Sequence, residues 1–137
     1  MNNNPASHPP AESPEDQENL YVVVCASGFE DVLRVRSALM FATLAAAADY
    51  HSVLYCIQNA VDVMVKGAIE KHEPPGSGPT ISSRLDEALQ HGVEIQCCTQ
   101  TMANKGISGD DLVPGAVTAG AMQLISLTAR AKAVLSF

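Results

Sequence analysis

Two adjacent cysteines, Cys97 and Cys98, carry the most reactive side chains of this sequence. They end a short apolar run, residues 93–98, and a small helix is expected to follow it. A thiol at such a strand-to-helix junction lies near backbone N–H dipoles, which favour the thiolate over the thiol. Because the thiolate is the nucleophilic form, Cys98 is the leading candidate for a catalytic residue.

The other cysteines have a simpler interpretation. Strand alternation places Cys97 on the opposite face of the strand from Cys98, so Cys97 is expected to pack in the core. A disulfide between these neighbours would be strained and easily reduced. Cys25 and Cys56 belong to apolar strands and are expected in or near the core, with Cys56 the more exposed. For Cys98 itself the alternative is a small buried hydrophobic residue.

Four polar residues are candidates for substrate binding around Cys98. Lys105 follows it by about two helical turns and could lower the thiol pKa or attract an anionic sulfur donor. Gln100 and Thr101 could donate hydrogen bonds to a bound sulfur or carboxylate, and Asn59 would face the same sheet edge. Ordinary roles explain them too: a solvated lysine, first-turn residues, and a helix cap at Asn59.

Other chemistries lack their sequence patterns. His51, His72 and His91 are scattered and do not form the paired ligand spacing of a structural zinc site. Gly28 follows the first strand, but no Gly-x-Gly-x-x-Gly pattern accompanies it, so a dinucleotide site is not indicated. No Ser, His and Asp arrangement stands out for hydrolysis. We therefore predict no metal and no cofactor.

Composition sets the broad class. The chain has 137 residues, a net charge of -7, 47% apolar residues and 4% aromatic residues. The negative charge argues against a nucleic-acid surface, and no apolar run reaches the roughly 20 residues of a membrane span. No secretory signal is recognisable, so reduced thiols and a cytoplasmic location are expected.

Apolar and polar segments alternate as strand and helix along the chain. Residues 1–19 are expected to form a disordered tail, and residues 20–137 one α/β domain with a mostly parallel, five-stranded sheet. The strands are expected at residues 20–26, 51–57, 93–98, 113–117 and 132–137, with Pro114 making the fourth a poor central strand. Helices are expected from Asp31 to about Ala48, from Asn59 past Ala68, over residues 84–91 and over residues 118–130. Ser82 or Ser83 is expected to cap the third of these helices. Residues 71–80 are expected to form a surface loop.

The ordered set of motifs between Tyr21 and Phe137 resembles the DsrE/DsrF family, which includes sulfur-relay subunits. The resemblance rests on the first strand with its Ala-rich helix and on five further segments. These segments are residues 51–53, residues 58–61, the strand end at Cys98, residues 105–112, and residues 119–121 with the terminal strand. It implies a three-layer α/β/α sandwich, assembly into trimers or hexamers, and a persulfide-carrying cysteine at Cys98. The sequence departs from many relatives at Thr101, where they have a second cysteine, and at Ala60, where they have glycine.

This resemblance predicts a sulfur-relay protein that carries sulfane sulfur as a persulfide on Cys98 and passes it to a partner thiol. Donor and acceptor proteins would be its partners, and an apolar stretch in the first helix, residues 40–48, also points to a homo-oligomer. One alternative is a non-catalytic oligomeric module that binds a ligand or a partner chain. A third interpretation is a redox sensor that uses Cys97 and Cys98.

Overall fold

The computed structural model describes residues 19–74, 76 and 80–137. The expected N-terminal tail therefore lies outside the described residues, apart from Asn19, and so does part of the expected loop at residues 71–80. The domain boundary near residue 20 stays a prediction.

A five-stranded sheet forms the centre of the molecule, with the strand order β4-β3-β2-β1-β5. All four neighbouring pairs are parallel, which confirms and sharpens the expectation of a mostly parallel sheet. The strands are β1 (Leu20–Cys25), β2 (His51–Cys56), β3 (Glu94–Cys98), β4 (Ala116–Ala119) and β5 (Ala133–Ser136). The three central strands are buried along most of their length because both of their faces are covered by helices.

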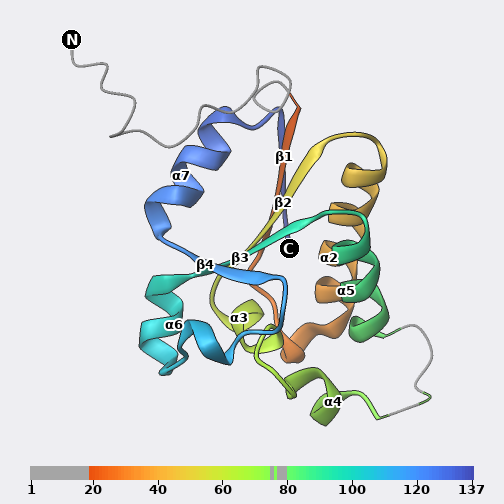
Figure 1. Cartoon of the computed structure of the whole chain (residues 1–137), viewed down its shortest axis with the longest axis vertical. Helices are drawn as coiled ribbons and strands as arrows, with labels where there is room; N and C mark the ends of the chain where they lie inside the picture. Colours follow the sequence, from red (N-terminus) through yellow and green to blue (C-terminus); the bar gives the residue numbers. More distant parts are fainter. Residues whose placement is uncertain (1–18, 75, 77–79) are drawn as a thin grey trace.

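Helices cover both faces of the sheet, so the predicted α/β/α layering is present (Figure 1). One layer consists of α2 (Val32–Ala47) and α5 (Ile81–Gln90), which pack on each other, and α7 (Ala121–Arg130) covers the opposite face. Short elements gather where β1, β2 and β3 end, and these are η2 (Phe29–Asp31), α3 (Asn59–Val63), α4 (Ala68–His72), α6 (Thr99–Lys105) and η3 (Gly109–Asp111). The carboxyl edge of the sheet is thus built from loops and short helices, which is where α/β proteins usually bind ligands.

Two apolar clusters, one on each face of the sheet, stabilise these layers. The larger cluster lies beneath α2 and α5 and includes Val23, Leu54 and Ile95. The smaller lies beneath α7 and contains Leu20, Val22, Val53, Tyr55, Cys98 and Leu127. Because side chains alternate along β3, Cys97 and Cys98 belong to different clusters, as the sequence predicts.

The structure corrects two helix boundaries. The expected second helix is interrupted between α3 and α4, where Val65 bridges to Leu112 and Gly67 takes a left-handed conformation with φ of +79°. The helix expected from residue 118 begins at Ala121, because residues 118 and 119 pair with the end of β3. Pairing with a neighbouring strand is a tertiary effect that local sequence patterns do not contain.

Three smaller expectations were also wrong. Gln58 takes the cap position of α3, so Asn59 is its first helical residue. Thr80 caps α5, and Ser83 completes the capping box from inside the helix. Cys56 is fully buried, so it is not more exposed than Cys25.

Several large apolar side chains remain exposed on both outer layers. Leu33, Phe41 and Leu44 lie on α2, and Met122 and Ile125 lie on α7. Val117 lies on the edge strand β4, a few residues before α7 in the sequence. Among the described residues, no helix combines the length and apolarity that crossing a membrane requires.

Candidate functional site

Cys98 lies where the loops after β1, β2 and β3 converge. The register aligns Cys25 of β1 with Cys56 of β2, and Cys56 with Cys97 of β3, so the three strands end at nearly the same level. The loops that leave these strands must therefore pack against one another. Cys98 is the last residue of β3 and immediately precedes α6.

Hydrogen-bond donors surround the Cys98 sulfur. Burial raises the pKa of the thiol, but hydrogen bonds from the Thr101 N–H, the Tyr55 hydroxyl, the Gln100 N–H and the Thr101 hydroxyl outweigh it. The net effect is a pKa below the ordinary value of a cysteine. Although the residue is only 6% exposed, these donors favour its thiolate.

The Tyr55 hydroxyl is shared between Cys98 and the start of α7. It donates to the carbonyl oxygens of Ala119 and Gly120 at 3.0 and 2.9 Å. Burial and the neighbouring Cys98 raise the pKa of Tyr55 well above its ordinary value, so the phenol keeps its proton. Because a thiolate is a stronger acceptor than a carbonyl, we expect this proton to turn toward Cys98 when the thiol ionises.

Tyr55→Phe is expected to raise the pH at which Cys98 becomes reactive. The variant keeps the buried ring but removes a donor that stabilises the thiolate, so the pKa of Cys98 rises and less thiolate is present at neutral pH. The measurement is the rate of iodoacetamide alkylation of Cys98 as a function of pH. Tyr50→Phe, in an edge-to-face pair with Tyr21, is the control. An unchanged midpoint in Tyr55→Phe would show that the tyrosine does not act on the thiol.

Thr101 connects Cys98 to the loop that follows β2. Its hydroxyl oxygen accepts a hydrogen bond of 3.1 Å from the Gln58 N–H, which leaves its own proton free for the Cys98 sulfur. Gln58 has φ of +51° and ψ of -129°, a conformation that costs a non-glycine residue about 1–3 kcal/mol. Strain of this kind persists only where its surroundings hold it, and here it orients an N–H toward Thr101.

The loop after β1 supports the loop after β2 in turn. A Cβ atom added to Gly28 would overlap the carbonyl oxygen of Asn59, so only glycine allows this close approach. The Glu30 carboxylate accepts from the Gly28 N–H and holds the loop in place. Gly28, Gln58 and Thr101 therefore form a chain of contacts that ends at Cys98.

Gly28→Ala is expected to destabilise the protein by about 2–3 kcal/mol, the cost of overpacking against backbone that cannot easily move. The displaced Asn59 would also shift Gln58 away from Thr101, so alkylation of Cys98 should slow. Chemical denaturation and the alkylation rate measure the two effects. The control is Gly109→Ala, whose added Cβ would lie 3.4 Å from the nearest side-chain atom, a methyl group of Thr118. Equal stability of the two variants would contradict the expected close contact.

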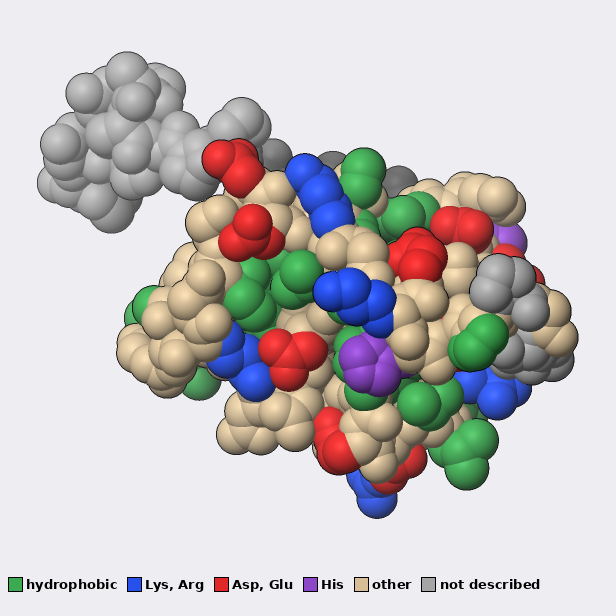
Figure 2. Space-filling view, turned by 90° about the horizontal axis from the view of Figure 1, so that it is seen from below, with side chains coloured by type: hydrophobic (Ala, Val, Ile, Leu, Met, Phe, Trp, Pro, Cys, Tyr) green, Lys and Arg blue, Asp and Glu red, His purple; other side chains and the backbone are tan. Residues whose placement is uncertain are grey.

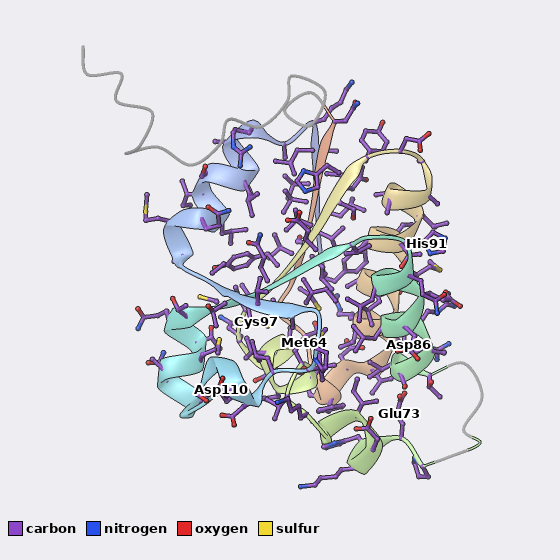
Figure 3. All side chains as sticks on the ribbon, viewed as in Figure 1. Met64, Glu73, Asp86, His91, Cys97 and Asp110 are labelled. Carbon is purple, nitrogen blue, oxygen red and sulfur yellow. The ribbon has the colours of Figure 1, made fainter. Side chains whose placement is uncertain are left out.

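Two of the cysteines beneath α2, Cys25 and Cys56, have a raised pKa. Burial raises the pKa of Cys25 to about 11, and its Sγ donates to the Ser27 carbonyl at 3.4 Å. A hydrogen bond with Cys97, followed by burial, raises the pKa of Cys56 well above its ordinary value. Cys97 is fully buried on the same face, where Figure 3 shows it in the interior near Met64. The expectation that Cys97 packs in the core thus agrees with its position.

The remaining candidates from the sequence lie at the same edge but have different neighbours. The Lys105 ammonium is 3.0 Å from the Asp62 carboxylate and 3.4 Å from the Asn59 amide oxygen. The Gln100 backbone is among the groups that lower the pKa of Cys98. Their roles in substrate binding stay predictions. Among the described residues, no three His, Cys, Asp or Glu side chains lie close enough to hold a metal ion.

Sequence reasoning missed Tyr55, Gln58 and Gly28. Tyr55 lies in a mostly apolar strand, where an aromatic residue normally indicates only packing. Gly28 in the loop after the first strand was visible in the sequence, but its contact with Asn59 joins residues 31 positions apart. Nothing local distinguishes Gln58 as a residue with positive φ, since that conformation is usual for glycine.

Fold and site together define a class: α/β/α proteins with one polarised thiol at the carboxyl edge of a parallel sheet. The chain belongs to the DsrE/DsrF-like family, whose model matches residues 8–137. No curated protein matches the chain.

Solved structures share the fold. The ychN protein of E. coli has a TM-score of 0.74 and 21% identity, over 87% of this chain and 99% of that one. MTH1491 from Methanobacterium thermoautotrophicum, a protein of unknown function, has a TM-score of 0.59 and 18% identity, over 85% and 96%. BT1422 from Bacteroides thetaiotaomicron, also of unknown function, has a TM-score of 0.59 and 14% identity, over 92% and 100%. At these identities the likeness shows the fold alone.

Proposed function

We propose that this protein carries sulfane sulfur as a persulfide on Cys98 and passes it to the thiol of a partner. The observation that carries the proposal is the set of donors on the Cys98 sulfur from Tyr55, Gln100 and Thr101, which lowers its pKa. The same donors would stabilise the terminal sulfur of a persulfide anion, which is also a negatively charged acceptor. Membership of the DsrE/DsrF-like family supports the assignment, because that family includes sulfur-relay subunits.

Sulfur transfer requires no oxidant. The Cys98 thiolate attacks the outer sulfur of a donor persulfide R–S–SH, the donor S–S bond breaks, and R–S⁻ leaves as Cys98–S–SH forms. In the second step an acceptor thiolate attacks the outer sulfur of Cys98–S–SH, and the Cys98 thiolate is regenerated. Both steps exchange one S–S bond for another, so the number of electrons is conserved.

A carrier role fits the position of the thiols better than a disulfide oxidoreductase role. Thr101 stands where many relatives have a second cysteine, and Cys97 projects to the other face of the sheet from Cys98. Among the described residues, the cysteines other than Cys98 all belong to the cluster beneath α2 and α5. A persulfide on Cys98 would therefore lack a neighbouring thiol on its own face and would persist until a partner arrives.

Assembly into a homo-oligomer, a trimer or hexamer in this family, is part of the proposal. Leu33, Phe41 and Leu44 on α2, together with Val117, Met122 and Ile125 around β4 and α7, are exposed apolar side chains that a second subunit could cover. Sulfur donor and acceptor proteins would be further partners.

Intact mass spectrometry of the native protein tests the proposal. After incubation with inorganic polysulfide, the wild-type chain is expected to gain the mass of one sulfur atom and to lose it on reduction. Peptide mapping should locate the added sulfur on Cys98. No gain would overturn the proposal and favour a non-catalytic module of the same fold. A gain located on another cysteine would overturn the assignment of Cys98 as the carrier.

A further inference from the structure

Two adjoining hollows open at the carboxyl edge of the sheet. One, of about 600 Å³, lies among η2, α3 and α4, and the other, of about 320 Å³, lies between α3 and α6. They share Asn59 and Lys105 as lining residues. Each has the size of a small-molecule site, whereas docking of a whole protein needs a wider surface. Figure 2 shows the molecule from this side, with acidic and basic side chains interspersed.

The lining of the larger hollow carries both signs of charge at short range. The Lys105 ammonium is paired with the Asp62 carboxylate, and the Glu30 carboxylate lines the same hollow. The side chains of Lys105 and Asp62 are 29% and 41% exposed, so solvent screens their ion pair and the pair contributes little to stability. A ligand can therefore replace one partner of this pair at small cost. A carboxylate would bind Lys105, and an ammonium group would bind Asp62 or Glu30.

Apolar side chains complete the larger hollow. Phe29 and His72 stack with ring centroids 3.8 Å apart and planes inclined by 6°, and Val65, Ala68 and Ile107 also line this hollow. This flat and aliphatic lining suits the methylene groups of a small organic molecule better than an inorganic ion.

The smaller hollow lies beside these charges and along α6, the helix that begins directly after Cys98. Thr101 lines it, and the same residue donates its N–H and hydroxyl to the Cys98 sulfur. Gln58, whose N–H bonds to Thr101, lines it as well. A ligand whose charged groups lie at Lys105 and Asp62 would thus extend its other end toward Thr101 and the thiol.

The geometry points to a low-molecular-weight persulfide that bears both a carboxylate and an ammonium group as the sulfur donor of Cys98, with Lys105 and Asp62 holding those two groups. This inference rests on the proposed persulfide function and names its substrate class. The Cys98 thiolate takes the outer sulfur of the bound R–S–SH, the donor S–S bond breaks, and the thiolate R–S⁻ leaves the hollow.

The test compares initial rates of Cys98 loading from four donors by quenched intact mass spectrometry. The donors are cysteine persulfide, the persulfide of cysteamine without a carboxylate, the persulfide of 3-mercaptopropionate without an ammonium group, and inorganic polysulfide. Loading from cysteine persulfide should saturate with concentration. Removal of either charged group should lower the apparent second-order rate about tenfold, the effect of one lost charge-assisted hydrogen bond.

Variants test whether Lys105 and Asp62 bind the charged groups of the donor. In Lys105→Met the rate ratio of cysteine persulfide to polysulfide should fall about tenfold, the effect of one lost ionic contact. Lys132→Met, an exposed lysine just before β5, is the matched control and should keep the wild-type ratio. Asp62→Asn is an independent variant and should reduce the preference for cysteine persulfide over the mercaptopropionate persulfide. Thermal melts confirm that each variant is folded.

The outcomes separate this inference from the proposed function. Equal rates for all four donors, or ratios insensitive to both variants, would overturn the donor class while leaving the persulfide function intact. Loading from inorganic polysulfide but not from cysteine persulfide would likewise overturn only the donor class. Failure of every donor to load Cys98 would overturn the proposed function as well.

Discussion

Replacing Cys98 by serine is expected to abolish sulfur loading completely and to leave the fold intact. Serine is somewhat smaller than cysteine but keeps a hydrogen-bonding group at this position, so the contacts with Tyr55, Gln100 and Thr101 have a partner in the variant. A hydroxyl near neutral pH neither ionises nor attacks the outer sulfur of a persulfide. The loss should therefore appear in the intact mass, while the free energy of unfolding changes by about 1 kcal/mol or less.

Cys25→Ser is the matched control for this prediction. Cys25 also ends a strand and is buried, and the serine hydroxyl can still donate to the Ser27 carbonyl. This variant should load one sulfur atom as the wild type does. Loading that persists in Cys98→Ser would show that another thiol carries the sulfur, and the donors around Cys98 would then have a structural role.

A small thiol reagent is expected to modify Cys98 roughly 1000-fold faster than the other three cysteines. Those three thiols lie in the core, and labelling them requires opening of the protein at a cost of about 5 kcal/mol or more. Cys25, Cys56 and Cys97 are at most 2% exposed, and burial opposes ionisation of Cys25. Cys98 combines a lowered pKa with a position at the sheet edge, beside a hollow lined by Thr101. Time-resolved alkylation followed by peptide mapping measures the four rates in one sample.

Denaturant provides the control for selective labelling. In concentrated urea all four thiols become accessible, and the rate differences should shrink to within about tenfold, the spread that thiol pKa values alone would cause. If Cys98 in the native protein were labelled as slowly as Cys56, the thiol would be inaccessible without unfolding. That result would indicate that Cys98 is a structural cysteine. The two hollows would then be the candidate sites for a non-covalent ligand.

Local patterns in the sequence were sufficient for the framework of this protein. The apolar runs that became β1, β2 and β3 are buried on both faces, and such strands differ clearly in composition from the polar segments between them. Alternation along β3 correctly separated Cys97 from Cys98, because the side-chain period of a strand is independent of its surroundings. The order of elements and the layering followed from the same local information.

Tertiary contacts decided where local rules failed. Residues 118 and 119 joined β4 because the end of β3 offered hydrogen-bonding partners, and α3 ended early because Val65 pairs with Leu112. Asn59 did not cap α3, since the strained Gln58 occupies the cap position and is held by Thr101 across the edge of the sheet. Each of these contacts joins residues distant in sequence, and their energies exceed the local preferences that they override.

The same distinction holds for the site. From the sequence alone, Cys98 could be chosen as the candidate thiol, because a cysteine between an apolar strand and a polar helix is recognisable within a few residues. What polarises that thiol was decided by the fold: Tyr55 lies one strand away, and Gly28 and Gln58 act through the packing of adjacent loops. Lys105, plausible by spacing as a partner of the thiol, instead pairs with Asp62. A thiol pKa depends on the three-dimensional arrangement of donors around the sulfur, which sequence distance does not determine.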